Sequence, residues 1–162
     1  MTSPKRTSAR PKLSAGILAY RLTSHGLEVL LVHPGGPYWR NKDLGAWSIP
    51  KGEIEASEDP EQAARREFAE ELGPAASIGA LQALGEIRQR GGKRVIAFCA
   101  EADFDTALLS SNSFEIEWPP RGGALKTFPE VDRACWFGLD AARSKILSGQ
   151  VELIDRLEEQ AS

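Results

Sequence analysis

Residues 52–73 of this chain read GEIEASEDPEQAARREFAEELG. Within them, Asp59 is a residue type that caps helix N-termini, Pro60 suits the first helical position, and Gln62 stands three residues after the cap. Gly73-Pro74 ends the helix, because glycine favours the left-handed cap conformation and proline cannot continue the hydrogen-bond pattern. The sequence therefore predicts a helix that begins after Asp59 and ends before Gly73.

The predicted helix carries different side chains on two faces. Glu67, Glu70 and Glu71 stand at positions i, i+3 and i+4, so they share one face. Neighbouring carboxylates repel each other, whereas a hard divalent cation such as Mg²⁺ binds oxygen ligands and reverses the sign of the interaction. Three glutamates alone are nevertheless more typical of a solvated helix face than of a site. An apolar stripe faces the core at every fourth position, namely Ala64, Phe68 and Leu72.

The residues that frame these glutamates change that interpretation. The frame is Gly52, five residues, Glu58, seven residues, Arg66-Glu67-Phe68, one residue, Glu70-Glu71, one residue, and Gly73. This arrangement resembles the Nudix box, from which Pro74 departs because the box has a bulky apolar residue there. Pro50-Lys51-Gly52 looks like the loop of Nudix enzymes that act on dinucleoside polyphosphates and related compounds. The resemblance extends over about Ser14 to Phe137.

The resemblance implies a reaction class and a metal. Nudix enzymes use Mg²⁺, for which Mn²⁺ can substitute, to cleave a phosphoanhydride bond by water attack at phosphorus. The implied substrate is a small molecule, either a nucleoside diphosphate linked to another group or a polyphosphate. Glu67, Glu70 and Glu71 match the family's metal-binding glutamates, and Gly52 matches a position whose backbone carbonyl can bind metal. Arg66 matches an arginine that pins a glutamate and the preceding loop.

Two assignments stay open at this point. Glu70, Glu67 and Arg66 are the catalytic candidates, but the glutamate that deprotonates water varies between members of the family. The family often adds an acidic metal ligand from a loop late in the domain. Glu130 is the candidate here because it precedes the last predicted strand, and Glu115 and Glu117 are its competitors.

Side chains outside the box are candidates for substrate binding. Aromatic rings can stack on a base, and basic groups can bind phosphates. The candidates for stacking are Tyr38, Trp39, Trp47 and Trp118. The candidates for phosphate binding are Lys51, whose loop adjoins the expected metal site, and Arg40, Lys42, Arg88, Arg90, Lys93, Arg94 and Arg121. Core packing is the favoured interpretation for Trp47. The proline typical of ADP-ribose hydrolases is absent at 88–90, and so is the tyrosine that several dinucleoside polyphosphate hydrolases carry slightly further on, so neither substrate is favoured.

Two other functions remain as alternatives. A Nudix-fold sensor that binds nucleotide without turnover is one, although such modules usually lose acidic residues of the box. An isopentenyl-diphosphate-isomerase-like enzyme is the other, because it shares the fold and uses a cysteine. Cys99 and Cys135 are present, but both lie in apolar runs that are typical of buried, reduced thiols.

Composition sets the broad class. The chain has 162 residues, 41% hydrophobic and 27% charged, with a net charge of −3, which fits one globular domain. No apolar run reaches the roughly 20 residues that span a bilayer, so we expect a cytoplasmic protein without a membrane partner. The net charge gives no indication of nucleic-acid binding, and the oligomeric state stays open. Residues 1–12 predict a disordered basic arm, and residues 13–162 predict a single domain.

Alternating segments of strand and helix predict the architecture. Strands are expected at 14–22, 27–33, 47–49, 80–90, 93–101 and 130–137, and helices at 139–147 and 151–160 besides the helix of the box. Residues 103–127 are expected to be irregular, with the proline-containing stretch 114–121 as an ordered loop over the site or an oligomer contact. The mixed order predicts an α/β fold, and the resemblance implies a Nudix-type three-layer α/β/α sandwich with a mixed sheet.

Overall fold

A computed structural model describes residues 12–161, and its centre is a six-stranded mixed sheet. The expected basic arm lies outside these residues except for Lys12. The strand order is β4-β5-β1-β2-β8, and the short β3 also pairs with β1. Strands β1 and β5 run parallel, and the other pairs run antiparallel. The bounds are β1 Leu13–Thr23, β2 Gly26–Pro34, β3 Lys51–Glu53, β4 Gln82–Arg88, β5 Arg94–Glu101 and β8 Val131–Gly138.

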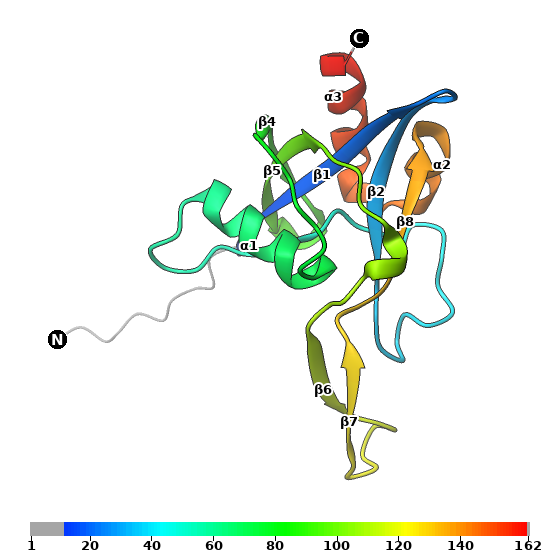
Figure 1. The fold of residues 1–162 in the computed structure, drawn as a ribbon. Helices are drawn as coiled ribbons and strands as arrows, with labels where there is room; N and C mark the ends of the chain where they lie inside the picture. The colour runs from blue at the N-terminus through cyan, green and yellow to red at the C-terminus, as the bar shows by residue number, and fades with distance from the viewer. Residues whose placement is uncertain (1–11, 162) are drawn as a thin grey trace, which may run out of the picture.

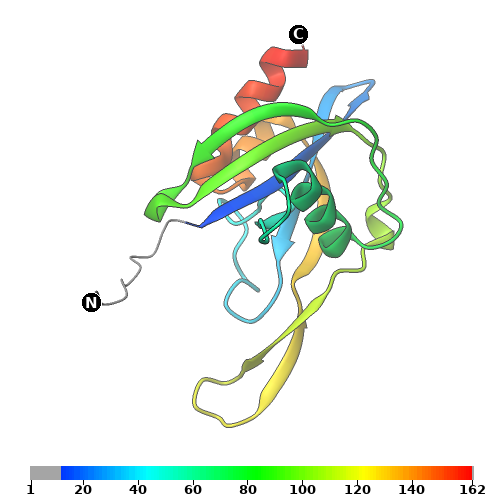
Figure 2. The ribbon, with the colours of Figure 1, turned by 90° about the vertical axis from the view of Figure 1, so that its left-hand side faces the viewer.

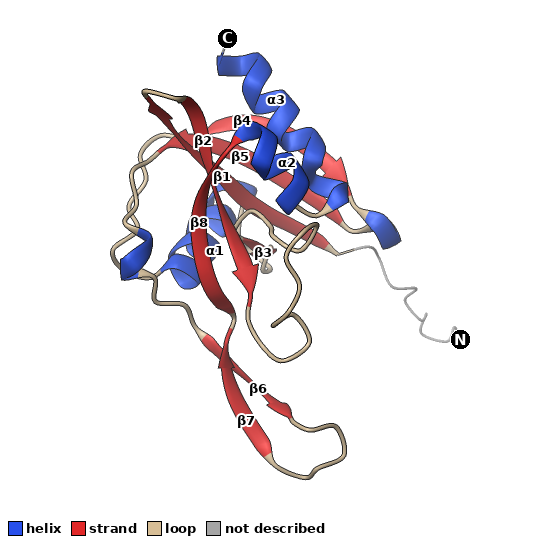
Figure 3. Ribbon diagram, turned by 90° about the vertical axis from the view of Figure 1, so that its right-hand side faces the viewer, coloured by secondary structure: helices blue, strands red, loops and turns tan. Residues whose placement is uncertain are grey.

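Helices cover both faces of this sheet. Helix α1 (Pro60–Leu72) packs on one face, and α2 (Leu139–Lys145) and α3 (Val151–Ala161) pack on the other (Figures 1 and 3). Three short 3₁₀ turns join the elements: η1 Arg90–Gly92, η2 Thr106–Leu108 and η3 Ser148–Gln150. The predicted three-layer α/β/α sandwich with a mixed sheet is therefore confirmed. Among the described residues, no helix has the length and apolar composition needed to cross a membrane.

The core consists of two apolar clusters, one on each face of the sheet. Successive residues of a strand point to opposite faces, so in β1 Leu18 packs in the cluster with α2 and α3, whereas Ile17 packs in the cluster with α1. The α1 cluster contains the predicted stripe of Ala64, Phe68 and Leu72, all buried. Cys99 is buried and Cys135 half-buried, and both are free thiols.

The structure corrects two expectations. Residues 103–127 are not irregular, because β6 (Ser113–Glu117) and β7 (Leu125–Pro129) form a separate antiparallel hairpin that projects from the body (Figures 1 and 2). The stretch 114–121 is thus mostly strand and turn rather than a loop over the site. Residues 47–49 make only isolated bridges at Trp47 and Ser48, and the strand of this region is β3 instead.

Candidate active site

Helix α1 begins and ends as its sequence predicts. The Asp59 Oδ1 accepts a hydrogen bond from the Gln62 backbone N–H at 2.8 Å, and the Gln62 Oε1 accepts one from the Asp59 N–H at 3.0 Å. At the other end, the Gly73 N–H donates to the Ala69 carbonyl at 2.8 Å with a φ of 96°. These caps satisfy backbone groups that a helix end leaves free. They fix the register of the carboxylates that α1 presents.

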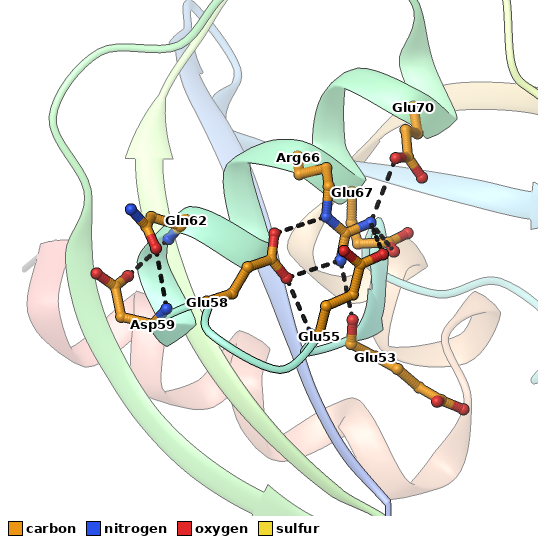
Figure 4. Close-up of polar contacts among 8 residues, drawn as sticks. All are labelled: Glu53, Glu55, Glu58, Asp59, Gln62, Arg66, Glu67 and Glu70. Carbon is orange, nitrogen blue, oxygen red and sulfur yellow. Dashed lines mark hydrogen bonds and ion pairs between the residues drawn. The ribbon is translucent and has the colours of Figure 1, made fainter.

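Arg66, on α1, donates hydrogen bonds both to the loop before this helix and to two glutamates of the helix itself (Figure 4). Its Nε and Nη2 donate to the two carboxylate oxygens of Glu58 at 2.7 and 3.0 Å, and Nη2 also donates to the Glu53 carbonyl at 2.9 Å. Its Nη1 donates to Glu67 at 2.8 Å and to Glu70 at 3.3 Å. The Arg66 guanidinium lowers the pKa of Glu58, and this carboxylate in turn raises the pKa of Arg66. Arg66 therefore links the β3–α1 loop to Glu67 and Glu70, two of the candidate metal-binding glutamates.

A carboxylate-rich cavity of about 440 Å³ lies between α1, β3 and the start of β8. We call it the carboxylate cavity. Five glutamates but only three lysines line it, so its walls carry an excess of negative charge. Its lining residues are Lys12, Ser14, Lys51, Gly52, Glu53, Glu67, Glu70, Glu71, Lys93 and Glu130.

Burial and mutual repulsion change the proton affinity of these groups. Burial, together with the Glu67 and Glu130 carboxylates, raises the pKa of Glu71 from 4.5 to about 8. Burial is also the main cause that raises the pKa of Glu67, although Arg66 opposes it. The same desolvation lowers the pKa of Lys51, whereas Glu71 and Glu67 favour its charged form. Lys51 therefore neutralises only part of the negative charge of the cavity's carboxylates.

A second cavity adjoins the first and is largely apolar. This apolar cavity has a volume of about 230 Å³ and shares Lys51, Glu71 and Glu130 with the carboxylate cavity. Trp39, about one-third exposed, lines it from the loop after β2. The other lining residues are Val32, Pro34, Ala46, Ser48, Ile49, Val131 and Leu147. An apolar chamber thus opens next to a charged one.

The chemistry of the donor set fits a hard divalent cation. Several carboxylates face one cavity with too few cationic partners, which is the arrangement that an oxygen-liganded cation stabilises. Among residues 12–161, however, no three acidic, histidine or cysteine side chains already converge on one coordination point. Glu67 and Glu70 instead accept hydrogen bonds from Arg66. The groups available to hold such a cation are the carboxylates of Glu67, Glu70, Glu71 and Glu130 and the carbonyl of Gly52.

The structure brings together some of the predicted substrate residues and separates others. Lys51 lines both cavities, and Trp39 lines the apolar one. Tyr38, Arg40 and Arg90 are described residues that line neither cavity. Tyr38 packs its ring against Trp118, whereas Arg40 and Arg90 are exposed.

Other candidates also find their places. Trp47 is buried, as its favoured interpretation predicts. Of the three late acidic residues, Glu130 lines both cavities, whereas Glu115 and Glu117 are exposed on β6 and line neither. Lys93 and Lys12 both reach the carboxylate cavity. The sequence singles out neither residue, because Lys93 is one of several basic candidates and Lys12 lies in the predicted basic arm.

The two cysteines lie apart from this site. Cys99 packs in the apolar cluster with α2 and α3, and Cys135 packs against the same cluster. Neither lines the carboxylate cavity or the apolar cavity. Burial raises the pKa of both thiols, so neither is activated as an acid or nucleophile. This placement gives no support to the isomerase-like alternative.

Comparison with known proteins identifies a protein family that this chain resembles in sequence. The family model of the NUDIX domain matches residues 10–157. The RNA pyrophosphohydrolase of Rhodospirillum rubrum is 42% identical to this chain over 67 residues. These residues are 40% of this chain and 39% of that protein, so the match spans well under half of the relative's length.

Two solved structures show the same fold. An Ap4A hydrolase of C. elegans, in a binary complex, superposes with a TM-score of 0.60 at 21% identity, covering 91% of this chain and 97% of that chain. The NUDIX domain of Shewanella oneidensis NrtR, complexed with ADP ribose, gives a TM-score of 0.61 at 20% identity, covering 96% and 91%. At these identities the likeness concerns the fold alone.

Proposed function

This chain belongs to the NUDIX domain family, and from that premise we propose that it is a Mg²⁺-dependent hydrolase that cleaves a pyrophosphate bond in a small nucleotide substrate. The family and the similarity to an RNA pyrophosphohydrolase support a hydrolase of phosphorus-containing acid anhydrides. The metal, the substrate and the roles of individual residues are the proposed part. One observation carries them: glutamates from α1 and Glu130, the residue just before β8, line one cavity.

The residues of the carboxylate cavity have different proposed roles. Glu67, Glu71 and Glu130, with the Gly52 carbonyl, would hold Mg²⁺. A cation held there would supply charge that neutralises the phosphates and stabilises the leaving group. Glu70 is the proposed proton acceptor, since its side chain is 37% exposed, against 13% for Glu67, and water can reach it. Arg66 positions both carboxylates by its hydrogen bonds.

The lysines and the apolar cavity point to how the substrate would bind. Lys51 lies where the two cavities meet, so its ammonium group can bind a phosphate that spans them. Trp39 and Ile49 line the apolar side, where a base could pack. The proposed substrate is therefore a nucleoside diphosphate linked to a further group, with the base in the apolar cavity. The names of two similar proteins, an RNA pyrophosphohydrolase and an Ap4A hydrolase, are compatible with this class.

A substrate panel tests the proposal. Nucleoside triphosphates, dinucleoside polyphosphates, nucleotide sugars and 5′-triphosphorylated oligonucleotides are incubated with the protein in Mg²⁺, in Mn²⁺ and in EDTA. We expect turnover of at least one nucleotide with either metal and none in EDTA. Running the best reaction in heavy-oxygen water identifies the phosphorus that is attacked. Tight nucleotide binding without product, with every compound and metal, would instead indicate a sensor.

A further inference from the structure

The β6–β7 hairpin stands apart from the main sheet and has no catalytic residue of its own. It projects from the body as a two-stranded sheet (Figures 1 and 2). Along β6, half-buried Phe114 and Ile116 alternate with exposed residues, and the Phe114 ring lies 6.1 Å from the Phe128 ring. A two-stranded hairpin alone is marginally stable in water. What the hairpin packs against therefore decides what it does.

The root of the hairpin is tied to the proposed site on two sides. The Glu130 N–H donates to the Asn112 carbonyl at 2.8 Å, and the Asn112 N–H donates to the Glu70 carbonyl at 3.1 Å. The Glu130 carbonyl accepts from the Gly35 N–H at 2.9 Å. Gly35 begins the loop of residues 35–46 between β2 and the buried residues Ala46 and Trp47. The hairpin root thus links α1, the start of β8 and this 35–46 loop.

The hairpin also packs along the 35–46 loop. A β-carbon at Gly36 would lie 2.8 Å from Cζ of Phe114, and one at Gly35 would lie 1.9 Å from the Pro129 carbonyl oxygen. The loop backbone therefore approaches the hairpin more closely than residues with side chains allow. Two residues further on, the Tyr38 and Trp118 rings meet edge to face, with centroids 5.2 Å apart at 80°. Aromatic pairs of this geometry are favourable beyond their buried area.

The same loop delivers Trp39 to the apolar cavity. Trp39 follows Tyr38 directly, and its ring lines the cavity together with Lys51 and Glu71. Neither Phe114 nor Trp118 lines either cavity. Phe114 and Trp118 therefore reach the apolar cavity through the loop that carries Trp39.

We propose that the β6–β7 hairpin is a specificity-determining support, in which Trp118 and Phe114 hold the 35–46 loop so that Trp39 closes the apolar cavity around a nucleobase. This inference rests on the proposed function, because it assumes that a nucleotide occupies the two cavities. Trp118 is a positioning residue, since it acts through Tyr38 and Trp39. Losing it should weaken the binding of the nucleoside part and leave the binding of the phosphates unchanged.

Binding measurements test this without requiring turnover. Calorimetry with Mg²⁺ gives the Kd of ADP and GDP, and inorganic pyrophosphate is the probe without a base. For Trp118→Ala we expect the Kd of the preferred nucleotide to rise about tenfold, which corresponds to about 1.4 kcal/mol, with the Kd of pyrophosphate unchanged. Trp118→Phe, which keeps an aromatic edge, should restore most of the affinity. Leu125→Ala is the matched control, because Leu125 lies on the same hairpin with 68% of its surface exposed.

A double variant identifies the route. If the hairpin acts through Trp39, then Trp118→Ala has no further effect on nucleotide affinity in a Trp39→Ala background. Additive effects, an equal loss of pyrophosphate affinity, or unchanged nucleotide affinity in a folded Trp118→Ala protein would each overturn the inference. These outcomes differ from a failure of the proposed function, in which the wild-type protein binds neither nucleotide nor pyrophosphate with Mg²⁺. Circular dichroism of each variant establishes that it is folded.

Discussion

The Glu67 carboxylate packs directly against the α-carbon of Gly52. A β-carbon at position 52 would lie 2.0 Å from Cδ of Glu67 and 2.3 Å from each of its carboxylate oxygens. Glu67 belongs to α1 and Gly52 to β3, so this contact sets the distance between helix and strand at the floor of the carboxylate cavity. The first glycine of the box is therefore required for space, since any side chain there would displace a proposed metal ligand.

Gly52→Ala should reduce activity far more than stability. The added methyl group must push Glu67 aside, and a misplacement of about 1 Å in a catalytic group costs on the order of 100-fold in rate. Steady-state kinetics and Mg²⁺ titration of the variant measure this loss. Gly79→Ala is the control, because nothing lies within 4 Å of a β-carbon there. A Gly52→Ala protein with wild-type kcat would mean that Glu67 needs no fixed position.

Arg66→Lys should lose both activity and stability, although it keeps the charge. Lysine cannot reproduce the two-pronged contact to Glu58 together with the bond to Glu67. We expect kcat to fall about 10- to 100-fold and the free energy of unfolding to fall by about 1–3 kcal/mol. Arg65→Lys separates the two effects, since Arg65 bonds the carbonyls of Ile78 and Gly79 outside the site. It should lower stability and leave kcat unchanged.

Glu71 should make the metal-free protein less stable as pH rises. Its pKa in the folded protein is about 8 against an ordinary 4.5, so between these values the folded chain binds a proton that the unfolded chain has released. The resulting stability is complete below about pH 4.5 and is lost as the pH rises toward 8. In EDTA, denaturant unfolding should show that the wild type loses on the order of 3 kcal/mol more than Glu71→Gln between pH 5 and pH 8.

Adding Mg²⁺ to the same two proteins tests whether a bound cation stabilises the ionised form of Glu71. At pH 8, Mg²⁺ should raise the stability of the wild type and raise that of Glu71→Gln less, because a bound cation favours the ionised carboxylate. Parallel pH profiles for the two proteins in EDTA would contradict the account of Glu71. The comparison cancels groups that titrate equally in both proteins.

Asp59→Ala should lower stability by about 1 kcal/mol, the usual contribution of an N-cap side chain. The variant loses the bond from the Asp59 carboxylate to the Gln62 N–H. Turnover by the folded protein should stay at the wild-type level, since Asp59 does not line the carboxylate cavity. Urea unfolding measures the change, and Glu61→Ala, which removes only an exposed ion pair with Arg65, should cost less.

The sequence predicts the parts of the molecule whose signals are local. Helix α1 is legible from Asp59, Pro60 and Gly73 because caps act within one turn. The β6–β7 hairpin is not predicted, although the alternation Phe114-Glu115-Ile116-Glu117 is a strand pattern, because the prolines after it and the mixed charges favour an ordered loop. The alternation outweighs them because those residues fall in the turn.

The candidate active site shows most clearly what the sequence predicts and what it does not. The box spacing identifies Glu67, Glu70 and Glu71, because all three lie within two turns of one helix. The contributions of Lys12 and Lys93 depend on strands far apart in the chain, β1 and β5, which pair side by side. No local pattern encodes that pairing, so a basic residue that reaches the cavity resembles any solvated one. Likewise, the sequence does not show that Trp39 lines a cavity whereas its neighbour Arg40 does not.

Turnover by Glu70→Gln at saturating Mg²⁺, on the best substrate of the panel, tests the central claim most directly. Glutamine keeps the size of the side chain but cannot accept the proton, so kcat should fall by at least about 100-fold while the protein stays folded and binds nucleotide. Glu61→Gln, on the same helix but outside the cavity, should retain full activity. Wild-type kcat in Glu70→Gln would contradict the assignment of Glu70 as the proton acceptor, and full activity of the wild type in EDTA would contradict the metal-dependent mechanism itself.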